Sequence, residues 1–175
     1  MMLWRISRHR DLGGMGGIRA PGRWHHAGQP VVYLAENPAA ALLEVCVHTS
    51  ANNAPPEFTL LKIEAPATQV QAIKIGDLPS DWQSRPEVTR DFGTAWLRKK
   101  ETALMQVPSA IVPETANFLL NPAHSDAKRF KVTDVFSYPL CRHTAALTCS
   151  LKKSSQSEVN QLRGNLAGWP NFGAA

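Results

Sequence analysis

The residue whose type and position most clearly indicate chemistry is Glu44, a carboxylate within residues 39–47, which are otherwise apolar. A carboxylate in such surroundings is costly to bury unless a partner satisfies its charge. The sequence therefore predicts either a functional acid or one that merely reaches solvent or pairs with an arginine. Arg23 and Tyr33 come earlier in the chain. Together with Glu44 they would place a cation, an aromatic ring and a carboxylate close in space.

This combination of groups suits cleavage of the glycosidic bond between nicotinamide and ribose. The transition state is a ribosyl oxocarbenium ion, which a carboxylate stabilises. Arginines can hold a diphosphate with paired hydrogen bonds, and an aromatic ring can stack on nicotinamide. Nicotinamide leaves readily, so no strong general acid is required. Ser109 lacks the flanking residues of a nucleophile elbow, which favours a hydrogen bond to phosphate or ribose, with an ordinary turn serine as the alternative.

Composition and charge set the class of protein in which such a site would lie. The chain has 175 residues, of which 43% are hydrophobic and 19% charged, values typical of one globular domain. Its net charge of +5 and the five arginines in residues 1–30 suit an anionic ligand. A nucleic-acid-binding module is therefore an alternative of a different class. The arginines cluster with glycines rather than with exposed aromatic residues, and Trp96 is expected to be buried, which disfavours that alternative.

Histidines and cysteines are present without the spacing of a metal site. None of the six histidines forms an i, i+4 helical pair, and the three cysteines (Cys46, Cys141 and Cys149) show no ligand spacing. We therefore expect no metal and no cofactor, and a buried Cys46. Residues 1–12 lack the apolar segment of a signal peptide, and no apolar stretch reaches membrane-spanning length. These features predict a cytoplasmic protein without a membrane partner.

The elements that must position these groups are short strands interrupted by two helices. Strands are predicted at residues 3–6, 31–35, 58–64, 103–107, 117–120 and 130–136. This order predicts an α+β domain with a curved, mainly antiparallel sheet.

The two predicted helices differ in their signals. The helix over residues 38–48 begins at Asn37, a good N-cap residue, followed by Pro38 at the first helical position. Because it is apolar nearly all round, we expect it to be buried. The helix over residues 86–102 carries Val88, Phe92 and Trp96 at four-residue spacing, which predicts a stripe facing the core.

Loops and composition define the boundaries of the domain. A glycine-rich loop over residues 11–22 would allow close approach to a ligand, but its spacing matches no known phosphate-binding loop. Residues 66–86 are predicted to be a loop-rich connection. The composition changes after Pro139 toward serine, threonine, glycine and asparagine. We therefore expect a catalytic domain over residues 1–139 and an atypical, poorly ordered tail over residues 140–175.

An ordered set of short motifs resembles the RES domain family, which is named for its Arg, Glu and Ser residues. The motifs are LWRI at 3–6, GRWH at 22–25, VY at 32–33, ALLE at 41–44, VPS at 107–109 and NFLLNP at 117–122. The resemblance extends over residues 2–138 and implies an α+β fold like that of ADP-ribosyltransferases.

The resemblance also implies a function and roles for individual residues. It implies the toxin of a type II toxin–antitoxin pair with NAD as substrate and an Xre-like antitoxin as partner. Nucleic acid would be contacted only through that partner, and a homo-oligomer is left open. Family members cleave NAD by hydrolysis or phosphorolysis or transfer ADP-ribose to a protein, and the sequence does not separate these reactions. The resemblance implies that Glu44 is the catalytic carboxylate, assisted by Arg23 and Tyr33, and that the substrate is bound by Arg5, Arg23, Tyr33, Ser109 and Asn117.

Overall fold

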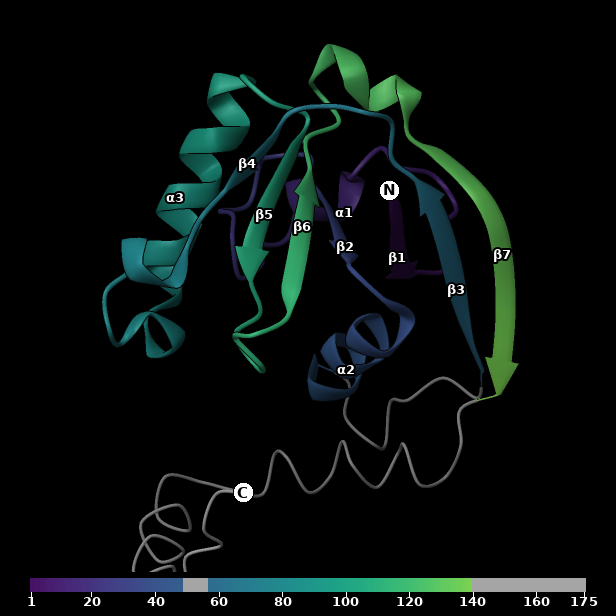
Figure 1. The fold of residues 1–175 in the computed structure, drawn as a ribbon, viewed down its shortest axis with the longest axis horizontal. Coiled ribbons are helices and arrows are strands. Elements are labelled where there is room, and N and C mark those ends of the chain that lie inside the picture. Colours follow the sequence, from purple (N-terminus) through teal and green to yellow (C-terminus); the bar gives the residue numbers. More distant parts are fainter. Residues whose placement is uncertain (49–56, 140–175) are drawn as a thin grey trace, which may run out of the picture.

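A computed structural model describes residues 1–48 and 57–139 (Figure 1). The predicted tail over residues 140–175 lies outside the described residues. Seven strands form one sheet in the order β4-β5-β6-β2-β1-β3-β7, and all neighbouring strands are antiparallel except β4 and β5. The strands are β1 (Met2–Ile6), β2 (Val32–Ala35), β3 (Glu57–Glu64), β4 (Val70–Ala72), β5 (Leu104–Pro108), β6 (Ala116–Leu120) and β7 (Lys131–Pro139). The predicted α+β class with a mainly antiparallel sheet is confirmed.

Within the described residues, three α-helices accompany the sheet: α1 (Met15–Arg19), α2 (Pro38–His48) and α3 (Pro86–Lys99). Helix α2 has the predicted bounds, and the side chain of Asn37 accepts a hydrogen bond from the Ala40 N–H at 2.8 Å, as an N-cap should. Figure 1 shows α3 at one side of the domain and the β3–β7 pair at the other, with α2 between them.

Side chains on the two faces of the sheet form separate parts of the core. Leu3, Val32, Leu34, Leu61, Ile63, Leu104, Phe118 and Leu120 pack together on one face. On the opposite face Met105, Val107 and Leu119 pack against α3 and its flanking tryptophans, while Ala35 and Leu60 pack against Ala41 of α2. Both α2 and α3 therefore lie on the same face of the sheet, and the residues between them are positioned by both helices.

Helix α3 faces the core with a different stripe from the predicted one. Trp96 is buried, but Phe92 is 44% exposed, so its assignment to the core is wrong. The buried residues of the helix are Thr89, Gly93, Thr94, Trp96 and Leu97. Glycine at position 93 decides this orientation, because a Cβ there would overlap the carbonyl oxygen of Trp24. A close backbone contact has replaced the aromatic contact that the four-residue spacing predicted.

Two regions predicted as loops contain short elements. The loop over residues 11–22 includes α1, and residues 66–86 include β4 and the 3₁₀ helices Ile75–Asp77 and Trp82–Ser84. Gly14 adopts a left-handed φ of 68°, and a Cβ there would lie 2.5 Å from the backbone nitrogen of Val31. The close approach that this glycine permits is therefore to the chain itself.

Cys46 is buried, as predicted, and burial raises the pKa of its thiol. Cys141 and Cys149 lie outside the described residues. In the part of the chain that the structure describes, no helix has the length and apolar character needed to span a bilayer.

Candidate active site

Helix α2 presents the carboxylate of Glu44 to the ends of strands β5 and β6. Its Oε1 accepts hydrogen bonds from the Ser109 hydroxyl at 2.9 Å and from the Asn117 side-chain amide at 2.6 Å. Ser109 directly follows β5, and Asn117 pairs with Val107 across the β5–β6 ladder. Two donors from neighbouring strands converge on one oxygen, which fixes the orientation of the carboxylate. Asn117 thus lies within β6 and contacts the acid.

The hydroxyl of Ser109 is fully engaged by its surroundings. Its oxygen accepts hydrogen bonds from the backbone N–H groups of Ile111 at 3.1 Å and Val112 at 3.3 Å, while its hydrogen is donated to Glu44. The residue is only 3% exposed. Ser109, predicted to contact phosphate or ribose, thus contacts the carboxylate of Glu44 and two backbone amides.

Tyr33 lies on the same face of the sheet, and its hydroxyl is held by two partners. It accepts a hydrogen bond from the Trp24 N–H at 2.9 Å, and it lies 2.8 Å from Nδ1 of His25. Burial raises the pKa of Tyr33 well above its usual range, so the phenol keeps its proton. Burial also lowers the pKa of His25, which favours the neutral imidazole. Because Nδ1 of His25 also accepts a hydrogen bond from the Gly22 N–H at 3.1 Å, it acts as an acceptor, and the tyrosine hydroxyl donates to it.

Arg23 is anchored by the 3₁₀ helix Trp82–Ser84. Its Nη2 donates to the carbonyl oxygens of Trp82 at 2.8 Å and Gln83 at 2.6 Å, and the guanidinium lies 5.5 Å from the centre of the Trp82 ring. Burial lowers the pKa of Arg23, and the charge of Arg90 lowers it further, whereas Glu44 raises it. Arg23 is therefore within electrostatic reach of both the carboxylate and a second arginine.

Arg5 is not brought into this cluster. It pairs with Leu61 across the β1–β3 ladder, and alternation along β1 puts it on the face of Leu3 and Leu61, opposite to that of Tyr33. Its Nη1 donates to the carbonyl oxygen of Asp11 at 3.2 Å. Burial lowers the pKa of Arg5, and the nearby Asp11 opposes this shift.

Helix α3 supplies residues beside this site that the sequence analysis missed. Nε of Arg90 donates to the carbonyl oxygen of Gly22 at 2.9 Å, and the Thr89 hydroxyl donates to that of Arg23 at 2.7 Å. The Coulomb effect of Arg90 also reaches Tyr33. An arginine in a helix usually faces solvent, so no local signal marks Arg90. Its place follows from the orientation that Gly93 gives to α3.

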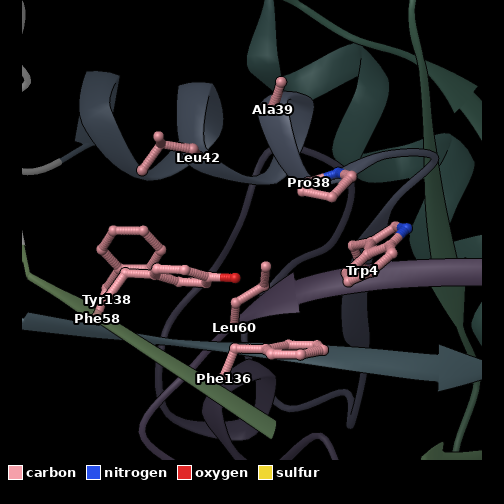
Figure 2. Close-up of a pocket in the computed structure, with 8 residues that line it drawn as sticks. All are labelled: Trp4, Pro38, Ala39, Leu42, Phe58, Leu60, Phe136 and Tyr138. Carbon is pink, nitrogen blue, oxygen red and sulfur yellow. The ribbon is translucent and has the colours of Figure 1, made fainter. Parts of the chain in front are cut away.

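An apolar groove of about 350 Å³ lies on another part of the same face, between α2 and strands β1, β3 and β7. It is lined by Trp4, Pro38, Ala39, Leu42, Phe58, Leu60, Phe136 and Tyr138. Figure 2 shows α2 on one side of this groove and the aromatic rings of Phe58, Phe136 and Tyr138 on the other. None of the residues around Glu44 lines it, and its walls offer no charged group to a phosphate. The candidate active site is therefore the polar cluster around Glu44.

The fold and site together define a class of protein: a small α+β domain in which a helix fixes a carboxylate between two antiparallel strands. Residues 2–141 match the RES domain family. The chain belongs to this family and groups with its toxins.

Two relatives and one solved structure illustrate the similarity. The Toxin Res of Pseudomonas putida strain KT2440 is 46% identical over 134 residues, which span 75% of this chain and 92% of that protein. The Prs ADP-ribosylating toxin of Sphingobium sp. strain YBL2 is 38% identical over 143 residues, spanning 75% of this chain and 89% of that protein. A chain in the crystal structure of the M. tuberculosis MbcT-MbcA toxin-antitoxin complex has a similar fold, with a TM-score of 0.65 at 18% identity, over 87% of this chain and 89% of that one.

Proposed function

We propose that this protein is the toxin of a toxin–antitoxin pair and that it cleaves the nicotinamide–ribose bond of NAD in the cytoplasm. The observation that carries the proposal is the carboxylate of Glu44, held by Ser109 and Asn117 and within electrostatic reach of Arg23. These are the charges that the reaction needs: an anion near the ribose and a cation for the diphosphate.

In the proposed reaction the bond between the ribose carbon and the nicotinamide nitrogen breaks, and its electron pair stays with nicotinamide. The ring thereby loses its positive charge and needs no proton. The ribose carbon becomes an oxocarbenium ion, which the negative charge of Glu44 stabilises. Water, phosphate or a protein nucleophile then bonds to that carbon and releases a proton. Tyr33, whose hydroxyl is fixed by Trp24 and His25, would offer its ring to nicotinamide.

Release of nicotinamide from NAD by the wild-type protein and by Glu44→Gln tests this function. The glutamine side-chain oxygen still accepts from Ser109 and Asn117, so folding should be nearly unchanged while the negative charge is lost. We expect kcat to fall by about 100-fold or more, the usual effect of removing a group that stabilises the transition state. The matched control is Glu36→Gln, an exposed residue just before α2, which should keep full activity.

Two results would contradict the proposal in different ways. Full activity of Glu44→Gln would remove this carboxylate from the mechanism. If the wild-type protein released no nicotinamide in the presence of water, phosphate and protein acceptors, NAD cleavage itself would be refuted.

Transfer of ADP-ribose to a protein is the second candidate, favoured by the name of the Sphingobium relative, an ADP-ribosylating toxin. It shares the first bond cleavage and differs only in the acceptor. NAD labelled in its adenosine part separates the two reactions in a cell extract. Label that stays on protein after denaturation supports transfer, whereas label found only in small molecules supports hydrolysis or phosphorolysis.

We further propose an antitoxin as partner, because one solved structure with a similar fold is that of a toxin–antitoxin complex. That the antitoxin is of the Xre type is proposed from the membership in the RES family alone. Three of the five tryptophans, Trp24, Trp82 and Trp96, are at most 3% exposed and cannot stack on bases. Direct binding of nucleic acid by this protein is therefore the weaker hypothesis. Binding to DNA only in the presence of the product of the neighbouring gene would support the partner, whereas salt-sensitive binding by the toxin alone would contradict it.

A further inference from the structure

We propose that Arg90 forms, with Arg23, a two-arginine subsite for a diphosphate, and that this subsite makes the protein select dinucleotides over uncharged nucleosides. This inference rests on the proposed function, because it assigns one part of the substrate to residues beside the Glu44 cluster.

Helix α3 places Arg90 beside the segment that carries Arg23. Nε of Arg90 donates to the carbonyl oxygen of Gly22, and the preceding residue, Thr89, donates to that of Arg23. The two contacts fix Arg90 next to the backbone of the first arginine. The next residue, Trp24, donates to the Tyr33 hydroxyl, so the arginine pair adjoins the aromatic part of the site.

Both guanidinium groups have hydrogen-bonding capacity left over. Within residues 1–48 and 57–139, the terminal nitrogens of Arg90 donate no hydrogen bond and its guanidinium forms no ion pair. The Nε of Arg23 is buried and has no partner among the described residues. The Nη1 of Arg23 likewise donates no hydrogen bond among the described residues, so both arginines keep a terminal nitrogen that could donate to a bound anion.

The two positive charges also act on each other and on the site. After burial, the charge of Arg90 is the largest cause that lowers the pKa of Arg23, while Glu44 and Glu87 raise it. The charge of Arg90 also opposes the upward pKa shift of Tyr33. The two cations repel each other, and a ligand with two negative charges would add attraction to both beyond what the nearby carboxylates supply. A diphosphate fits because one phosphate can accept paired hydrogen bonds from the terminal nitrogens of Arg90, and the other can accept from Nη1 of Arg23, whose Nη2 already donates to two carbonyl oxygens.

The inference is tested by comparing two substrates that share the scissile bond. NAD carries a diphosphate, whereas nicotinamide riboside carries no phosphate. For Arg90→Gln we expect kcat/KM for NAD to fall by about 10- to 100-fold, the usual range for lost hydrogen bonds to a charged group. For nicotinamide riboside we expect no change. Arg90→Lys keeps the charge but not the planar fork and should give a smaller loss that is likewise confined to NAD.

Two control variants separate binding from structural support. Arg98→Gln removes an exposed arginine from the same helix and should leave both substrates unaffected. Thr89→Val removes the neighbouring anchor of the same segment without changing charge, so any loss it causes should be equal for NAD and nicotinamide riboside. If Arg90→Gln also lowered kcat/KM equally for both substrates, Arg90 would only anchor Gly22 and the inference would be overturned.

Binding of ADP, measured by calorimetry, gives a readout that does not depend on catalysis. Arg90→Gln should weaken ADP binding by about 10-fold or more and reduce its salt dependence, while Arg98→Gln should not. If the wild-type protein cleaved neither substrate, the proposed function would fail and the ADP result alone would decide this inference. Unchanged ADP affinity in both Arg90 variants would overturn it even if NAD were cleaved.

Discussion

Replacing Ser109 by alanine tests whether this residue orients the carboxylate or binds the substrate. Its hydroxyl donates to Oε1 of Glu44 and accepts from the N–H groups of Ile111 and Val112. In Ser109→Ala the Oε1 atom of Glu44 keeps the Asn117 amide as a donor but loses the serine hydroxyl, so the orientation of the carboxylate is less restricted. We therefore expect the defect to lie in kcat for NAD cleavage, with KM nearly unchanged.

The magnitude follows from the three lost contacts. A hydrogen bond to a charged group contributes about 1.5–3 kcal/mol, which corresponds to a fall in kcat of about 10- to 100-fold. The amides of Ile111 and Val112 lie near the surface, where water can replace the lost acceptor in part. The free energy of unfolding should therefore fall by only about 1–3 kcal/mol.

The assays are steady-state nicotinamide release and urea unfolding, with exposed Ser137→Ala as control. A double-mutant cycle with Glu44→Gln sharpens the test: once the carboxylate is gone, Ser109→Ala should have little further effect on kcat. A large rise in KM with unchanged kcat would refute the reasoning, because it would mean that Ser109 contacts the substrate directly.

Two further predictions concern the support of the site. Gly93→Ala should lower the free energy of unfolding by about 1–3 kcal/mol or more, because its methyl group would overlap the Trp24 carbonyl. Gly16→Ala, with open space around it, should not lower it. Equal stability of the two variants in urea would contradict the close contact. Burial lowers the pKa of His25 in the folded protein. Below about pH 6.5 the unfolded chain therefore takes up a proton at this residue more readily than the folded protein does. The free energy of unfolding should fall as the pH is lowered from about 7 toward the folded-state pKa. His25→Asn should flatten this dependence and exposed His9→Asn should not; an unchanged slope in His25→Asn would show that other groups cause it.

The elements with strong local signals could be predicted from the sequence. Helix α2 was found because Asn37 and Pro38 mark its start, and the central strands because apolar runs end at turn residues. The short elements were missed for a physical reason. Strand β4 has three residues and depends on β5 for its hydrogen bonds, and α1 contains two glycines, so tertiary contacts rather than propensity form both.

The candidate site was predictable in part, through residues whose types are unusual for their surroundings. Glu44 stands out as the acid in an apolar helix, and the structure brings Ser109 and Asn117 to it. The contribution of Arg90 was not predictable, because it depends on the rotation of α3 about its axis. The four-residue hydrophobic spacing predicted a rotation that turns Phe92 toward the core. In the structure Phe92 is exposed, and the close backbone contact at Gly93 determines the rotation instead.

This rotation has a consequence for how the site is held together. Four residues of α3 each contact a different residue of the segment from Gly22 to His26. Arg90 binds the carbonyl of Gly22, Thr89 that of Arg23, Gly93 adjoins that of Trp24, and Thr94 accepts from the His26 N–H. Because one rigid helix makes all four contacts, a rotation by one residue would break them together. The segment also supplies the N–H and the imidazole that hold the Tyr33 hydroxyl. Any change that loosens α3 should therefore disturb the cation and the aromatic ring of the site at once, while the Glu44–Ser109–Asn117 contacts, which depend on α2, β5 and β6, persist.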